Sequence, residues 1–334
     1  MPESEQPPVL HEARPARGAD RRDFFKLAAA GAAVGFGAAG LAGRASAQTA
    51  PAAAPSDTDI LNFALNLEYL EAQFYSFAAI GTGIPPALLP GTQTQGAAVG
   101  GRKANLQDPV VIQYAREIAS DELAHVTTLR RVLGSAAVAQ PALDISPQIF
   151  TAAAVAAGID LSASGGVFDP YASDDNFLLA AYIFEDVGVT AYKGAAPLLS
   201  SPDNVDGAAG ILAAEGFHAG IIRAALYRRG VEVPALWTAT DQISALRNRL
   251  DGDVSSAGPP QRVANDDSGV SPVQTQFGLT ANFVPTDSNG IVFSRNSEQV
   301  HNIAYLTQNA ATSGGFFPNG TNNPNPALRR SGAN

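Results

Sequence analysis

Two short motifs in the sequence combine a carboxylate and an imidazole at a spacing that suits metal binding. Both read Glu-x-x-His: the first pairs Glu122 with His125, and the second pairs Glu215 with His218. Residues three positions apart on a helix share a face, with Cβ atoms about 5 to 6 Å apart, so each pair can reach a common ion. One such pair arises by chance in many chains. Two pairs that use half of the four histidines indicate a metal site.

A glutamate in an apolar run precedes each motif along the chain. Glu68 and Glu185 are each followed seven positions later by a tyrosine, Tyr75 and Tyr192, which lies two turns on along the same helix face. The two halves therefore read alike, with a Glu-x6-Tyr helix and then a Glu-x-x-His helix. This internal repeat supplies four carboxylates and two imidazoles, the ligand set of ferritin-like di-iron and di-manganese carboxylate bundles.

The expected metal follows from the chemistry of these ligands. Four ionised carboxylates inside an apolar bundle would repel one another and take up protons, a cost that two divalent cations remove. The chain has no Cys, so the ligands are oxygen and nitrogen atoms. Such a set suits iron or manganese, whereas zinc more often takes fewer ligands in a tetrahedral site. We therefore expect a cofactor of two metal ions, iron or manganese.

Some acidic residues near the motifs leave the assignment open. Glu71 lies one turn from Glu68 on a helix without an obvious polar face. It could replace Glu68 as the ligand, accept a hydrogen bond from an imidazole N–H, or form part of an ion path. The tyrosine spacing favours Glu68. Asp121 and Asp186 are expected to be solvated or to lie beside ligands, and His301 is expected to have no functional role.

The helices that position these residues can be read from apolar patterning, capping residues and Pro or Gly boundaries. Asp57 or Thr58 is expected to begin the first helix, and the stretch from Asp203 to Asp206 the fourth. No convincing alternation of strand residues is present. We expect an all-α fold, a four-helix bundle of two helix pairs joined by a long crossover, with a short fifth helix and an irregular C-terminal extension. The helices are predicted over residues 59–80, 108–133, 173–199, 203–230, 234–250 and 296–308.

The chain outside the bundle divides into an N-terminal and a C-terminal part. Arg21 and Arg22 precede two Phe and a Lys, and an Ala/Gly-rich run then ends at Ala47. This pattern indicates a signal peptide over residues 1–47 that resembles a twin-arginine export signal, except that Asp20 stands in front of the arginine pair. We expect cleavage after Ala47. The alternative is a membrane-anchored N-terminus, for which the apolar run is short.

The domain organisation follows from these boundaries. Residues 48–56 are a linker, residues 57–230 are the bundle, and residues 231–334 are an extension with short helices and a disordered tail. The mature chain is expected to be periplasmic or extracellular. The twin-arginine export machinery would be a partner, and this route carries proteins that are already folded, often with a cofactor loaded. His11 lies in the export segment and is expected to have no functional role.

The run from Leu61 to Tyr75 resembles the branch of the ferritin-like superfamily that includes desiccation-related proteins. The resemblance covers about residues 57–230. It implies that the single glutamates, the motif glutamates and the motif histidines have different roles. Those roles are ligands from single-motif helices for Glu68 and Glu185, bridging carboxylates for Glu122 and Glu215, and one terminal nitrogen per metal for His125 and His218.

The same resemblance implies that Tyr75 and Tyr192 are groups beside the ligands or close to the redox centre. The crossover and the chain beyond residue 230 have no counterpart in a minimal ferritin. Assembly into a cage is therefore not expected, although the chain could form a homo-oligomer.

Two functions fit this reading. The first is a dimetal oxidoreductase that acts on O2 or peroxide, by ferroxidase-like iron oxidation or by manganese-catalase-like peroxide disproportionation. The second is a non-catalytic extracytoplasmic protein, structural or related to stress such as desiccation, with an incidental or structural metal. A complete ligand set favours metal binding and leaves turnover open. The formal net charge of −10 argues against nucleic acid as a partner, because binding to the phosphate backbone requires clustered Lys and Arg.

Overall fold

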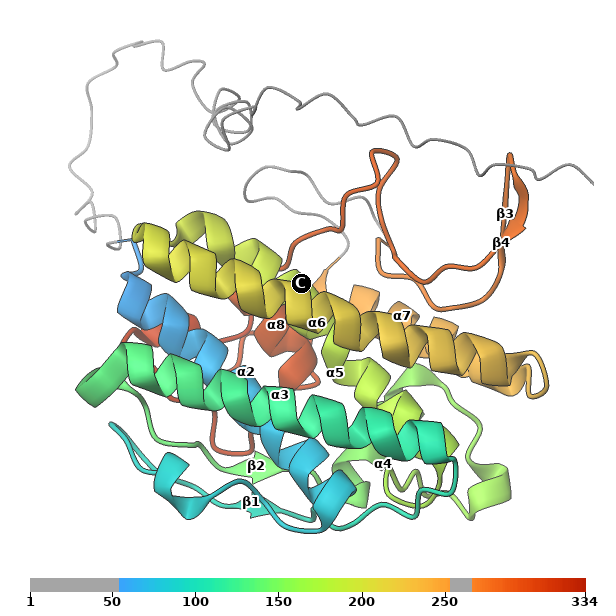
Figure 1. Ribbon diagram of the computed structural model, residues 1–334, viewed down its shortest axis with the longest axis horizontal. Helices are drawn as coiled ribbons and strands as arrows, with labels where there is room; N and C mark the ends of the chain where they lie inside the picture. The colour runs from blue at the N-terminus through green and yellow to red at the C-terminus, as the bar shows by residue number, and fades with distance from the viewer. Residues whose placement is uncertain (1–53, 253–265) are drawn as a thin grey trace, which may run out of the picture. The chain divides into compact units, whose positions relative to one another are not determined.

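Four long helices form the body of the protein (Figure 1). The computed structural model describes residues 54–252 and 266–334, so His11 and the expected export signal lie outside the described residues. Helix α2 packs mainly against α3 and helix α5 mainly against α6, and further contacts join α2 to α5 and α3 to α6. The expected all-α class is therefore confirmed. The four helices are α2 (Asp57–Ile80), α3 (Pro109–Leu133), α5 (Asp174–Ala195) and α6 (Pro202–Gly230).

Each long helix begins after a residue whose side chain accepts a hydrogen bond from the first turn. The expected caps were wrong by one or two positions for the first helix and by two or more for the fourth. Ser56 caps α2 in a capping box with Asp59, and Ser201 caps α6. The Ser201 cap agrees with the proline that follows it, because proline is favoured at the first helical position. The four caps are Ser56, Asp108, Ser173 and Ser201.

Equivalent aspartates tie the helix pairs together at their N-terminal ends. Asp57 begins α2, and its carboxylate accepts a hydrogen bond from the backbone N–H of Ser201 at the start of α6. Asp174 begins α5 and accepts from the backbone N–H of Asp108 at the start of α3. The side chain of Asn204 and backbone N–H groups before α6 hold the pKa of Asp57 well below its usual value. The same contact thus recurs in both halves, which agrees with the repeat in the sequence.

Helix α6 is long and apolar enough to cross a membrane by length and composition alone. Helices in the cores of soluble bundles meet the same criterion. The packing of α6 against α5 and its buried Glu215 and His218 account for its apolar character as a bundle helix.

The loop between α2 and α3 and the crossover between α3 and α5 lie side by side. Strand β1 (Ala98–Val99) pairs in parallel with β2 (Leu143–Asp144), and helix α4 (Pro147–Ala157) follows. Helix α4 packs against α7 (Ala235–Asp251). Short 3-10 helices mark the turns at Pro86–Leu88, Gly134–Ala136, Ser162–Ser164 and Ala196–Leu198.

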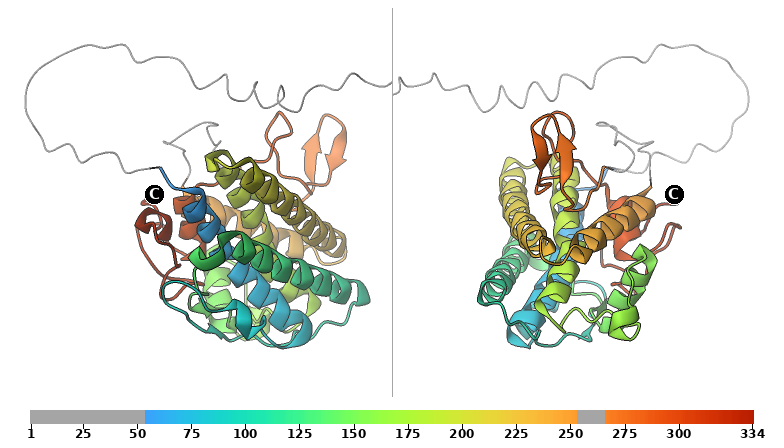
Figure 2. Two further views of the ribbon diagram at one scale, coloured as in Figure 1. Left: turned by 60° about the vertical axis from the view of Figure 1, so that its left-hand side comes forward. Right: turned by 90° about the vertical axis from the view of Figure 1, so that its right-hand side faces the viewer.

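The C-terminal segment after α7 returns to the bundle. Strands β3 (Val273–Thr275) and β4 (Gly278–Thr280) form an antiparallel hairpin that stands clear of the helices (Figure 2). Helix α8 (Ser297–Ala304) then packs against α5 and α7, and a last 3-10 helix covers Pro326–Arg329. The extension therefore contributes to the packed core.

The tail beyond α8 differs from the expected disorder. The helix predicted to reach residue 308 ends at Ala304, and the following residues bury Phe316 and Phe317. The buried side chain of Asn66 holds the backbone of the tail residue Asn322 through two hydrogen bonds, donating to its C=O and accepting from its N–H. An asparagine side chain can both donate and accept, so a polar, Asn-rich segment can be held in a core by satisfying backbone groups. The polar composition of the tail suggested disorder, because composition does not show which hydrogen-bond partners the polar side chains have in the folded protein.

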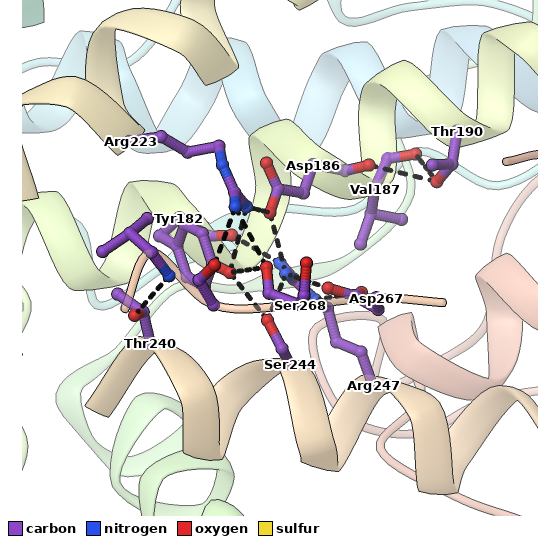
Figure 3. Close-up of polar contacts among 12 residues, drawn as sticks. Tyr182, Asp186, Val187, Thr190, Arg223, Thr240, Ser244, Arg247, Asp267 and Ser268 are labelled. Atoms are coloured by element: carbon purple, nitrogen blue, oxygen red, sulfur yellow. Dashed lines mark hydrogen bonds and ion pairs between the residues drawn. The ribbon is translucent and has the colours of Figure 1, made fainter. Parts of the chain in front are cut away.

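Three buried arginines and their buried aspartate partners lie where α5, α6, α7 and the C-terminal segment meet. Figure 3 shows two of these arginines, Arg223 and Arg247, with Asp186 and Asp267. Arg223 of α6 and Arg247 of α7 reach the same Asp186 oxygen at 2.7 and 2.9 Å. Asp267 pairs with Arg247 at 2.7 Å and with Arg295 at 2.6 Å. Opposite charges compensate one another within this network, so that removal of one partner leaves another charge buried and unpaired.

We predict that Asp267→Ala lowers the free energy of unfolding by about 3–5 kcal/mol, because two buried guanidinium groups lose a carboxylate. Urea unfolding followed by circular dichroism measures the change. Asp206→Ala removes an exposed carboxylate on α6 and should leave the stability close to that of the wild type. Equal effects of the two substitutions would contradict a stabilising role for the network.

Candidate metal centre

The six side chains predicted to bind metal converge inside the bundle. Each of the four long helices contributes, with single glutamates from α2 and α5 and a Glu-x-x-His pair from each of α3 and α6. All six residues are more than nine-tenths buried. They are Glu68, Glu122, His125, Glu185, Glu215 and His218.

The convergence follows from equal spacing in the two halves. Glu68 and Glu185 each lie eleven residues after the aspartate that begins their helix. Glu122 and Glu215 each lie fourteen residues after the capping residue of theirs. Because the helix starts are joined by equivalent contacts, equal spacing brings the four glutamates to the same level of the bundle.

The side chains form two groups that share Glu122. In each group one ligand atom per residue lies within 4.8 Å of all the others. The first group is Glu68, Glu122, His125 and Glu215, and the second is Glu122, Glu185 and His218.

The two imidazoles face the shared carboxylate with equivalent atoms. His125 Nδ1 lies 3.4 Å from Glu122 Oε2 and 3.2 Å from Glu68 Oε2. His218 Nδ1 lies 3.0 Å from Glu122 Oε1 and 3.7 Å from Glu185 Oε2. The ring centroids are 6.0 Å apart. Glu122 thus turns one oxygen toward each histidine, which is the position a carboxylate needs to bridge two ions.

The two tyrosines hold carboxylates of the opposite half. Tyr75 of α2 donates a hydrogen bond to Glu185 of α5, and Tyr192 of α5 donates one to Glu68 of α2. Burial, with the facing glutamates, raises the pKa of both tyrosines well above the usual value, so they remain protonated donors. The spacing placed each tyrosine near the glutamate of its own helix. It could not show that the two hydrogen bonds cross between the halves.

Several buried atoms of the cluster have no hydrogen-bond partner. They include both carboxylate oxygens of Glu215, one oxygen each of Glu122 and Glu185, and His218 Nδ1. Buried polar atoms in native proteins almost always have a partner, which can be a bound ion. Cations coordinated at these atoms would satisfy them and offset the carboxylate charge, so the residues fit a metal centre.

Burial perturbs the protonation of the glutamates. It raises the pKa of Glu68 to about 7 and that of Glu185 to about 8, and it raises the pKa of Glu215 well above the usual value. Burial also acts to raise the pKa of Glu122, but the attraction of the two nearby histidines outweighs it and lowers that pKa to about 2. Without metal, protons therefore take the place of cations on most of the carboxyl groups.

Burial acts on the pKa of the two histidines in the opposite direction. Burial acts to lower their pKa values, but the surrounding carboxylates outweigh it. They raise the pKa of His125 to about 11 and that of His218 to about 9. Both imidazoles therefore hold an extra proton that a metal ion must displace.

The structure separates the two glutamates that the sequence left as alternatives. Glu68 lies in the first ligand group, and Glu71 lies outside both groups. Asp121 was expected either to be solvated or to lie beside a ligand. It is half-exposed, and its Oδ2 lies 3.2 Å from His218 Nε2. Asp186 belongs to the arginine network, and His301 is buried between Ser297 and Thr321.

A four-helix bundle with Glu-x-x-His pairs and single glutamates around one buried centre defines the class of ferritin-like carboxylate bundles. The chain belongs to this family: residues 56–228 match the ferritin-like domain.

Two similar proteins cover most of the chain. Desiccation-related protein PCC13-62 of Craterostigma plantagineum is 34% identical over 283 residues, which is 82% of this chain and 85% of that protein. Ferritin-like catalase Nec2 of Nesocodon mauritianus is 31% identical over 281 residues, 80% of this chain and 84% of that protein. These spans exceed the matched domain, so the similarity includes part of the chain beyond residue 230. No solved structure matches the chain significantly.

The pKa shifts predict that the metal-free protein becomes less stable as the pH rises from about 5 to 9. Folding raises the pKa of Glu68 and Glu185 above the ordinary value of 4.5, so proton binding stabilises the folded state. This stabilisation is lost as the pH passes about 7 for Glu68 and about 8 for Glu185. The raised pKa values of His125 and His218 act with the same sign, above pH 6.5. Glu122 acts oppositely, but only below pH 4.5. Calorimetric melting temperatures test this.

The metal-loaded protein is the control for this pH dependence. Metal binds the deprotonated ligands, so the stabilisation that it gives should grow as the pH rises. A difference in melting temperature between loaded and metal-free protein that did not change with pH would contradict the assignment.

Proposed function

We propose that the protein binds two ions of iron or manganese at this centre and uses them to disproportionate hydrogen peroxide. The observation that carries the proposal is the pair of buried ligand groups that share Glu122, with unsatisfied carboxylate and imidazole atoms facing one another. The similarity to a protein named a ferritin-like catalase supports the reaction.

The ligands have distinct tasks in this proposal. Two redox-active ions would supply the capacity to take electrons from one peroxide molecule and return them to another. Glu122 contacts both histidines, whereas Glu68 and Glu215 contact His125 and Glu185 contacts His218. The hydrogen bonds from Tyr75 and Tyr192 fix one oxygen each of Glu185 and Glu68, which leaves the other oxygen directed at the centre.

A second candidate is a non-catalytic, stress-protective protein whose metal is structural. The similarity to a desiccation-related protein at 34% identity favours it. In this case the cations would stabilise the folded bundle by neutralising buried carboxylates, and removal of the metal would lower the stability without the loss of any turnover.

We also propose that the protein acts outside the cytoplasm. The proposal rests on the arginine pair and the Ala47 cleavage position in the N-terminal sequence. Export by the twin-arginine route would carry the folded bundle with its metal already bound. N-terminal sequencing of the exported protein should find a chain that begins near Gln48.

We predict that purified protein contains about two ions of iron or manganese per chain and evolves O2 from hydrogen peroxide. Glu122→Gln should lose most of the metal and lower the activity by more than about 100-fold, because it removes the carboxylate common to both groups. Elemental analysis and an oxygen electrode measure the two effects. Glu117→Gln, an exposed position on the same helix, is the matched control.

The results separate the two candidates. Metal at the centre without O2 evolution, together with a large loss of stability on chelation, would favour the structural metal. A metal content well below one ion per chain would contradict both.

A further inference from the structure

A small cavity lies beside the metal centre, between α2, α5 and the C-terminal helix α8. Its volume is about 30 Å³, and Phe316 of the tail closes it further. About 10–15 Å³ is enough for one water molecule. The cavity therefore has room for a molecule of two or three atoms heavier than hydrogen.

Glu71 is the one side chain lining this cavity that carries a polar group. It is 5% exposed, and its carboxyl group makes no hydrogen bond or ion pair with any other described residue. A buried polar group without a partner is costly, so this carboxyl group needs a ligand. The sequence singled out Glu71, and the two ligand groups do not include it.

Gly188 connects the cavity to the metal centre. A Cβ atom at this position would overlap Glu215 Oε2 and would lie 3.4 Å from Glu71 Oε1. The two carboxyl groups therefore lie near each other over the backbone of α5, and the absence of a side chain at Gly188 leaves room for the Glu215 carboxylate beside Glu71. Both oxygens of Glu215 lack a hydrogen-bond partner.

The C-terminal segment builds the outer wall of the cavity. Val300, Ile303 and Ala304 of α8 line it together with Glu71. Helix α8 is held in place just before its start, where Arg295 bonds to Thr190 of α5 and pairs with Asp267. The segment for which the sequence offered no function thus encloses the space next to the ligands.

We propose that this cavity is the binding site for hydrogen peroxide, and that Glu71 binds the peroxide by a hydrogen bond beside Glu215. The inference rests on the proposed peroxide activity. In either protonation state a carboxyl group accepts a hydrogen bond from a peroxide hydroxyl, whereas dioxygen offers no donor. A wholly apolar cavity would suit dioxygen as well, so Glu71 makes the site selective for a hydroxylic substrate.

The test compares metal-loaded variants of the full chain. Glu71→Leu removes the polar group and should raise the KM for hydrogen peroxide at least about tenfold, the loss expected for one hydrogen bond, with the metal content unchanged. Glu71→Gln retains an acceptor and should restore most of the affinity. Ala304→Val adds two methyl groups to the cavity wall and should also raise the KM. Glu117→Leu and Ala209→Val, at exposed positions, are the matched controls.

A second measurement does not depend on turnover. A crystal structure of the metal-loaded wild type should show an ordered solvent molecule on the Glu71 carboxyl group above Gly188, and the Glu71→Leu structure should lack it. A cavity without solvent in the wild type would overturn the assignment.

The outcomes distinguish this inference from the proposed function. An active wild type with unchanged KM in both Glu71→Leu and Ala304→Val overturns the inference alone. Loss of metal in Glu71→Leu overturns it as well, because Glu71 would then be a ligand. A wild type that holds metal but shows no peroxide turnover overturns both. If Ala304→Val does not fold, the two Glu71 variants decide.

Discussion

The burial of negative charge in an apolar bundle is the constraint on which the rest of the structure depends. Four glutamates and two imidazoles form two groups that share Glu122, and none of the four glutamates is more than 1% exposed. Ionised carboxylates in such a place require cations or protons. The apolar residues of α2 and α5 keep water from relieving the charge, so the ionised cluster requires compensation from within the bundle. The burial that is costly for the metal-free bundle is therefore what would favour a bound cation at the cluster.

The two halves of the bundle meet this constraint in the same way and then depend on each other. Equal spacing from the helix starts brings the glutamates to one level, and the aspartates that begin α2 and α5 fix those starts against α6 and α3. The tyrosine hydrogen bonds cross between the halves, so neither half completes its own ligand environment. The two repeated halves of the sequence thus form a single site to which both contribute.

The C-terminal segment makes this bundle more than a minimal ferritin-like domain. Asp186, one residue after Glu185, is linked through Arg247 to Asp267 of the C-terminal segment, and α8 lines the space beside Glu71. The similar proteins share part of this region, since their matched spans exceed the length of the domain. The network and the cavity wall give the extension a physical connection to the site.

The sequence by itself determined the all-α class and the six residues that converge, because helical periodicity and the Glu-x-x-His spacing are local properties. The sequence also restricted the range of metals that the site would suit, because a chain without Cys can offer only oxygen and nitrogen ligands. Only the tertiary structure showed that Glu68 and not Glu71 lies in the candidate ligand groups, because both are on one buried helix and only the positions of the other helices distinguish them. The crossed tyrosine bonds and the ordered tail were equally out of reach. Tyr192 with Glu68 and Asn322 with Asn66 are partners far apart in sequence, and a polar segment is ordered only when such distant partners are in place.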